Sequence, residues 1–254
     1  MIVEIFGPPA VGKTTLSHAI ADHLSQGGFG VDLALSYRPS ELAGKGRARS
    51  PGRPPGVVRV ARRLSRPAVE TLATARHLFG DSAEATMAKS LLALMPPVSP
   101  MWAIRLRQYI WRLTHSWNNA RAAERIVIFD QGFVQAVCSL AVLCTPEHRE
   151  RLRVAFGMIP RADLLVRVDA SPETLRARLL KREHQQGTLE RMLELDLNSN
   201  LRSIEIIDRL EQLLRERGAV MTCVQSGDEI SRRAALEWLD GAAARQFATV
   251  AVSA

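Results

Sequence analysis

The sequence GPPAVGKT at residues 7–14 decides the fold. It matches the pattern G-x-x-x-x-G-K-[ST], and it lies between a short apolar stretch, residues 2–6, and a helix-forming stretch, residues 13–26. In that setting the backbone N–H groups of the turn surround a phosphate, and the following helix adds the positive end of its dipole. The motif therefore predicts a loop that binds a nucleoside triphosphate.

The residues of this loop have distinct expected roles. The two glycines allow the sharp curvature that aims successive N–H groups at the β-phosphate of ATP. We expect Lys13 to reach the β- and γ-phosphates as a catalytic residue and the Thr14 hydroxyl to bind Mg²⁺. The expected ATP-binding residues of the loop are Gly7, Ala10, Val11, Gly12, Lys13, Thr14 and Thr15.

A second element of the site is expected at Asp130. Four apolar residues, 126–129, precede it and indicate a buried strand, so that Asp130 emerges at the carboxyl edge of a parallel sheet, where ligands bind. Its expected role is to hold Mg²⁺ with its hydration shell, or to accept the proton of a substrate hydroxyl. An aspartate that caps the next helix is the structural alternative, and the two roles are compatible.

Apolar strand-like runs alternate with longer stretches of helical period along the chain, which predicts a parallel sheet covered by helices. One domain is expected over residues 1–240, with a frayed tail at 241–254. Helices are predicted at 13–26, 101–123, from Ser171 to about Lys181, and over 189–217. Strands are predicted at about 2–6, 31–36, 125–129, 163–168 and 219–224.

The net charge of +8 is concentrated in one stretch. Nine basic residues and one acidic residue lie between Arg38 and Arg66, which indicates either a dock for a polyanion or phosphorylated substrate, or a solvated loop. Three cysteines without CxxC spacing argue against a disulfide framework or zinc site and favour a reducing, cytoplasmic setting. No secretory signal or membrane span is expected from the apolar runs.

The order of these elements resembles the thymidylate kinase and deoxynucleoside kinase group of P-loop kinases, over nearly the whole chain. The motifs that carry the resemblance are the phosphate loop, Tyr37-Arg38-Pro39, the helix with Arg107 and Gln108, Asp130, and the stretch VRVDASPE at 166–173. The family has an arginine after the aspartate, whereas Gln131 stands here. The resemblance implies a three-layer αβα P-loop NTPase fold with a five-stranded parallel sheet, a helical lid and a basic insertion after the second strand.

The resemblance also implies roles for residues outside the phosphate loop. The insertion would span residues 38–100 on the acceptor side, with Arg38, Arg107 and Gln108 as substrate-binding residues. The lid would span residues 178–190, and from it Arg178 and Arg182 would reach the ATP phosphates as catalytic residues. Gln225, at the end of the last strand, would lie against the adenine ring.

We therefore expect an ATP- and Mg²⁺-dependent kinase of a small acceptor, such as a nucleoside, a nucleotide or a similar polar metabolite. A polynucleotide or phosphosugar kinase, docked through the basic stretch, and a regulatory ATPase are the alternatives. Nucleic acid is not the favoured partner, and no membrane partner is expected. The sequence leaves the oligomeric state open, a homodimer included.

Overall fold

A five-stranded, fully parallel sheet forms the centre of the protein. The structure, a computed structural model, describes residues 1–36, 83–185 and 197–252. The strand order is β2-β3-β1-β4-β5, so β1, which leads into the phosphate loop, is central. The strands are β1 (Ile2–Phe6), β2 (Val31–Ala34), β3 (Ile126–Phe129), β4 (Leu164–Asp169) and β5 (Met221–Gln225). All five lie within two residues of their predicted bounds.

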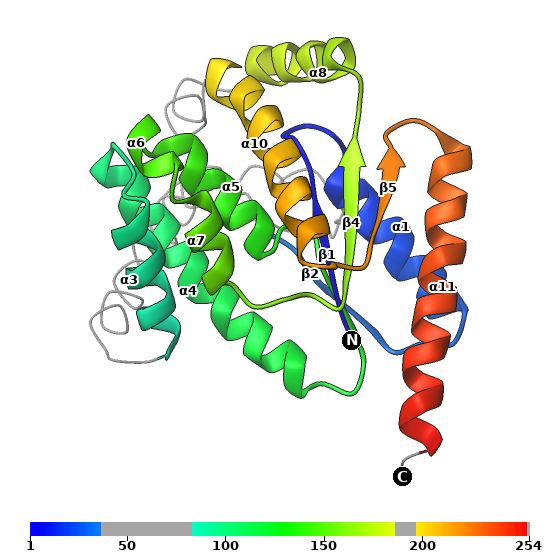
Figure 1. Cartoon of the computed structure of the whole chain (residues 1–254). Helices are drawn as coiled ribbons and strands as arrows, with labels where there is room; N and C mark the ends of the chain where they lie inside the picture. The colour runs from blue at the N-terminus through cyan, green and yellow to red at the C-terminus, as the bar shows by residue number, and fades with distance from the viewer. Residues whose placement is uncertain (37–82, 186–196, 253–254) are drawn as a thin grey trace, which may run out of the picture.

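Helices cover both faces of the sheet, which gives the three layers predicted from the sequence (Figure 1). The helices α1 (Lys13–Gln26) and α11 (Glu229–Val252) lie on one face. The other face carries α3 (Ala83–Leu94), α4 (Pro100–Ala122), α5 (Phe133–Leu143), α7 (Leu152–Met158) and α10 (Leu197–Glu216). The short α6 (Pro146–Arg149) precedes α7, and α8 (Pro172–Gln185) follows β4 at the carboxyl edge of the sheet.

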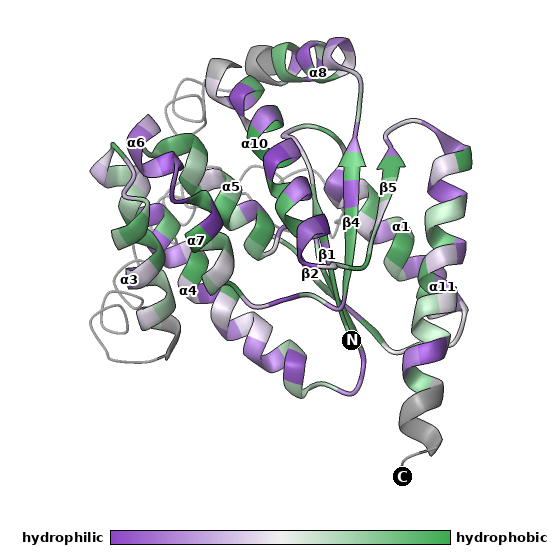
Figure 2. Ribbon diagram, in the orientation of Figure 1, coloured by the Kyte–Doolittle hydropathy of each residue, from purple (hydrophilic) through white to green (hydrophobic). Residues whose placement is uncertain are grey.

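The two faces of β1 explain the two cores. Ile2 and Phe6 point to the side of α5 and α10, whereas Val3 and Ile5 point to the side of α1 and α11. Because a strand alternates its side chains, a run that is apolar on both faces is typical of a central parallel strand. Figure 2 shows mostly hydrophobic strands at the centre and a mixture of hydrophilic and hydrophobic residues along the surrounding helices.

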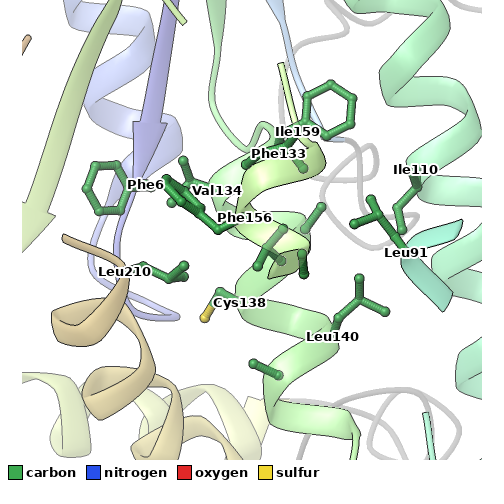
Figure 3. Packing of buried hydrophobic residues seen from close by; sticks show 14 of the residues in the cluster. Phe6, Leu91, Ile110, Phe133, Val134, Cys138, Leu140, Phe156, Ile159 and Leu210 are labelled. Atoms are coloured by element: carbon green, nitrogen blue, oxygen red, sulfur yellow. The ribbon is translucent and has the colours of Figure 1, made fainter. Parts of the chain in front are cut away.

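The helix predicted at residues 101–123 is confirmed as α4, and one of its faces is an apolar stripe that packs on the core. Leu106, Ile110, Leu113 and Trp117 are buried, and Trp117 packs on Phe129 with ring centroids 4.9 Å apart. Figure 3 shows the neighbouring core, in which Ile110 and Leu91 lie beside the side chains of α5.

The prediction of a frayed tail at residues 241–254 is wrong for most of that stretch, because α11 continues to Val252. Ala243 is fully buried, and the ring of Phe247 lies 5.9 Å from that of Phe29, which fixes this part of the helix against the α1 side. The buried face of this part of α11 consists largely of alanines, and alanines give a weaker apolar pattern in the sequence than larger residues do. No helix within the described ranges is long and apolar enough to cross a bilayer.

Candidate functional site

The loop between β1 and α1 has the backbone of an anion-binding nest. Ala10 and Gly12 have φ values of 61° and 106°, and this left-handed geometry turns successive N–H groups to one side. Gly7 lies against β4, where an added Cβ would come within 2.2 Å of the carbonyl oxygen of Val168. Only glycine fits there, which explains the first glycine of the motif. Ala10, by contrast, is a non-glycine residue held in a sparsely populated conformation.

The Lys13 side chain is folded onto this loop. Its Nζ donates hydrogen bonds of 2.8 Å to the carbonyl oxygens of Gly7 and Pro8, and the residue is 7% exposed. A charged amine is thus held over the nest.

Asp130 lies directly after β3, as predicted, and meets the first turn of α1. Its Oδ2 accepts a hydrogen bond of 3.0 Å from the Thr14 hydroxyl, and its Oδ1 accepts one of 2.7 Å from the backbone N–H of Ser36. The carboxyl group is almost completely buried. Two of the residues predicted as magnesium ligands, far apart in sequence, are therefore in direct contact.

Glu4 of β1 contacts the turn after Asp130, and the sequence motifs do not single this residue out. Glu4 is 1% exposed, and its Oε1 accepts a hydrogen bond of 2.6 Å from the N–H of Val134 in the first turn of α5. Burial raises the pKa of Glu4 to about 8, although the amides of α5 partly oppose the shift. A Cβ on Gly132 would lie 2.4 Å from Glu4 Cδ, so the turn and the carboxyl group fit closely. An acidic residue within an apolar strand was the available signal.

Tyr109 of α4 holds the same turn from another side. Its hydroxyl lies 3.2 Å from the carbonyl oxygen of Gln131 and 3.3 Å from that of Gly132. Burial raises the pKa of Tyr109, and the charges of Glu4 and Asp130 raise it further, so the phenol stays protonated and donates.

A cavity of about 410 Å³ opens beside the phosphate loop. Arg178 of α8 borders it and donates hydrogen bonds to the carbonyl oxygen of Val11 at 3.1 Å and to the Ser226 hydroxyl at 2.9 Å. It thereby joins the phosphate loop to the loop after β5. The other residues of the wall include Ala10, Gly12, Thr15, Leu16, Val168, Val224, Gln225, Gly227 and Asp228, so the predicted ATP residues Ala10, Gly12, Thr15 and Gln225 face one space.

The structure says less about the remaining predicted site residues. Arg107 and Gln108 are half-buried on α4. Two predicted segments lie partly outside the described residues. These are the basic insertion, of which residues 38–82 with Arg38 are not described, and the lid, of which residues 186–190 are not described. Arg182 lies on α8, but its side chain is not among those described.

A cluster of ion pairs around the buried Arg167 lies at β4, and the sequence motifs do not indicate it. Arg167 of β4 pairs with Asp169 at 2.7 Å, with Asp208 at 2.6 Å and with Glu211. Asp208 and Glu211 belong to α10, so this arginine ties that helix to the sheet at the strand that touches Gly7. The sequence RVD at 167–169 is ordinary for the end of a strand, and the α10 partners of Arg167 lie about 40 residues away. The sequence therefore does not predict these ion pairs.

Comparisons with known proteins agree with this architecture. A family model described as an AAA domain matches residues 2–207. The deoxyadenosine kinase from M. mycoides with bound dATP is similar in structure, with a TM-score of 0.51, 13% identity, and coverage of 94% of this chain and 100% of that chain. The same kinase with dCMP and a flexible dCDP bound has a TM-score of 0.49, 13% identity, and coverage of 95% and 100%. No curated protein matches the chain.

Proposed function

Because this chain belongs to the AAA domain family and has the P-loop kinase fold of a deoxynucleoside kinase, we propose that it is an ATP-dependent kinase. The proposed reaction transfers the γ-phosphate of ATP to a small acceptor, a nucleoside, a nucleotide or a similar polar metabolite. The observation that carries the proposal is the contact between the Thr14 hydroxyl and Asp130 at the end of the nest, 3.0 Å long.

The oxygen atoms of this pair suit magnesium. Mg²⁺ prefers hard oxygen ligands and is held in phosphate-transferring sites by few protein groups. Thr14 and Asp130 are the proposed ligands, directly or through water. When bound, the metal would neutralise charge on the phosphate oxygens.

The basic side chains around the nest have proposed roles in the transfer. The Lys13 amine, which donates to the carbonyl groups of Gly7 and Pro8, is proposed to exchange these contacts for phosphate oxygens when ATP binds. Arg178 is proposed to fix the nucleotide between the phosphate loop and the Ser226 loop. That Arg178 and Arg182 stabilise the transferring phosphoryl group stays a prediction, as does the lid at 178–190.

The acceptor is proposed to bind beyond Asp130, on the side of α4. Arg107 and Gln108 of that helix, together with Arg38, are the proposed acceptor-binding residues, and residues 38–100 form the proposed acceptor-side insertion of one domain, 1–240. Asp130 is also proposed to accept a hydroxyl proton of the acceptor. The three cysteines are free, which supports a proposed reducing, cytoplasmic setting.

The test is acceptor-dependent ADP release. The chain is mixed with ATP, Mg²⁺ and a panel of nucleosides, nucleoside monophosphates and sugar phosphates, and ADP is measured for wild type, Lys13→Met and Arg121→Met. At least one acceptor is expected to raise ADP release. Loss of the lysine charge is expected to lower kcat about 100-fold or more, whereas Arg121, exposed on α4 far along the helix, serves as the control.

Two results would contradict the proposal. Slow ADP release that no acceptor changes would favour a regulatory ATPase. Acceptor-dependent activity that is equal in wild type and Lys13→Met would remove the phosphate loop from the mechanism.

A further inference from the structure

A second cavity lies at the opposite edge of the sheet from the phosphate loop. It has a volume of about 220 Å³, and residues just before β4 and β5 border it. It shares none of its wall with the cavity beside the phosphate loop.

Most of this wall is apolar. Figure 3 shows three of its residues in the core: Val134 on α5, Phe156 on α7 and Ile159 directly after α7. In the wall they are joined by Leu165 of β4 and Leu214 of α10. A surface of this kind favours the hydrocarbon or aromatic part of a molecule. Since binding pockets for drug-sized molecules measure about 300–1,000 Å³, a ligand of this cavity is smaller than these.

Glu4 is the one buried ionisable group of the wall. It comes from the middle of β1, is 1% exposed and is hydrogen-bonded to Val134, so it lies at the inner end of the cavity. With its pKa near 8, the carboxyl group is mostly protonated at neutral pH and adds little charge.

The charged groups at the mouth are two arginines and one aspartate. Arg161 is exposed and forms no ion pair with another described residue. Arg217 is fixed by a hydrogen bond of 2.8 Å to the carbonyl oxygen of Phe156, with its guanidinium 4.6 Å from that ring's centroid. Asp163 accepts a hydrogen bond of 2.6 Å from the N–H of Ile2. Two guanidinium groups against one carboxylate leave a single net positive charge.

We propose that this cavity is a binding site for a small, mainly apolar molecule that carries one negative charge, such as an aromatic carboxylate. The apolar wall takes the body of the ligand, and the arginines at the mouth take its charge. The charge complementarity selects a monoanion over a neutral molecule of the same shape.

The same site reaches the turn that carries Asp130. Glu4 accepts from the first turn of α5, and Gly132 has no room for a Cβ above it. A ligand that contacts Glu4 therefore changes the surroundings of the Val134 amide, four residues after Asp130. This gives the cavity a direct structural connection to the candidate site at the other edge of the sheet.

Calorimetry with 1-naphthoate, and with neutral 1-naphthamide as the matched ligand, tests the site. Wild type is expected to bind about one naphthoate per chain and to bind the amide about tenfold more weakly or not at all. Arg161→Gln is expected to weaken naphthoate binding about tenfold, whereas Arg121→Gln, exposed on α4, leaves it unchanged. Ala162→Leu and Ala219→Leu, which fill the cavity, are expected to abolish it.

Two results would overturn the site. One is the absence of naphthoate binding to wild type, and the other is equal binding to wild type, to Arg161→Gln and to whichever of the two leucine variants folds.

Amide hydrogen exchange tests the connection between this cavity and the turn after Asp130. Saturating naphthoate is expected to change the exchange rate of the amides of residues 133–135 several-fold, and unchanged rates with bound ligand overturn that connection. Both measurements are independent of catalysis, so their failure and the failure of the kinase proposal are distinguishable.

Discussion

Among single residues, Glu4 makes a prediction about pH. Its pKa is about 8 in the folded protein against 4.5 for the free group. Between these values the unfolded chain has lost the proton that the folded chain keeps. The contribution of Glu4 to stability is therefore complete below about pH 4.5, and it is lost as the pH rises toward 8. The loss is on the order of a few kcal/mol.

Glu4→Gln, which imitates the protonated group, is expected to remove this dependence. Denaturant unfolding of wild type and variant at several pH values from about 5 to 8.5 measures it. Wild type is expected to lose stability relative to Glu4→Gln as the pH rises. Glu205→Gln, exposed on α10, is the control, and parallel curves for wild type and Glu4→Gln would refute the assignment.

Residues with a local motif could be predicted, and residues defined by distant partners could not. The sequence GPPAVGKT fixes Lys13 and Thr14 at one loop, and the apolar strand before Asp130 fixes its edge. Tyr109 and Glu4 contact a turn that lies 22 and about 130 residues away. An acidic residue within an apolar strand marks Glu4 as unusual, but the neighbouring sequence does not identify the turn that it contacts.

Among the elements, α8 is expected to help bind the nucleotide through Arg178. That side chain bonds to Val11 and Ser226 at the wall of the larger cavity. A hydrogen bond from this charged group to the bound nucleotide would contribute about 1.5–3 kcal/mol, so Arg178→Met is expected to raise the Kd for Mg·ATP about tenfold or more. Arg176→Met, exposed on the same helix, is the control, and calorimetry compares them. Equal affinities in the two variants would separate α8 from nucleotide binding.

The turn between β3 and α5 is expected to tolerate no side chain at its glycine. Gly132→Ala would place a Cβ 2.4 Å from Glu4 Cδ, and such overpacking costs about 1–3 kcal/mol. Gly30→Ala is the control, because its Cβ would lie 3.6 Å from the nearest atom. A double-mutant cycle with Glu4→Ala, followed by denaturant unfolding, is expected to give a cost well below the sum. Strict additivity would mean that the two residues do not touch.

Element boundaries could be predicted where the sequence has a strong helix-capping or helix-breaking residue. The helix start after Ser171 is confirmed, since the Thr174 N–H donates to the Ser171 hydroxyl at 3.2 Å. No helix was predicted for the stretch that forms α11, and its last part was expected to be frayed, because Gly241 and the alanines after it lack the large apolar residues from which a buried face is recognised.

For the whole molecule, bound Mg·ATP is expected to raise the melting temperature. Ligand at 100 times its Kd adds about 2.7 kcal/mol to the free energy of unfolding. In a chain of this size that is a shift of about 5–10 °C. Thermal unfolding with ATP, with and without Mg²⁺ or EDTA, measures it. A shift that survives EDTA unchanged, or that Asp130→Asn retains in full, would argue against the Thr14–Asp130 pair as the metal site.

The layered architecture itself was predictable, because a parallel sheet covered on both faces requires alternating apolar strands and amphipathic helices. The apolar runs do not specify the pairing order β2-β3-β1-β4-β5, since that order depends on which strands meet across more than a hundred residues. The smaller cavity belongs to the same class of feature: several separate elements build it, and none of them carries a motif.

The central place of β1 has a consequence for biosynthesis. Its neighbours β3 and β4 are translated about 120 and 160 residues after it, so the ribosome releases an apolar ribbon that stays unpaired on both edges for much of elongation. Partial products that stop before Ile126 therefore expose a surface suited to chaperone capture, and the nascent polypeptide acquires its nest only late.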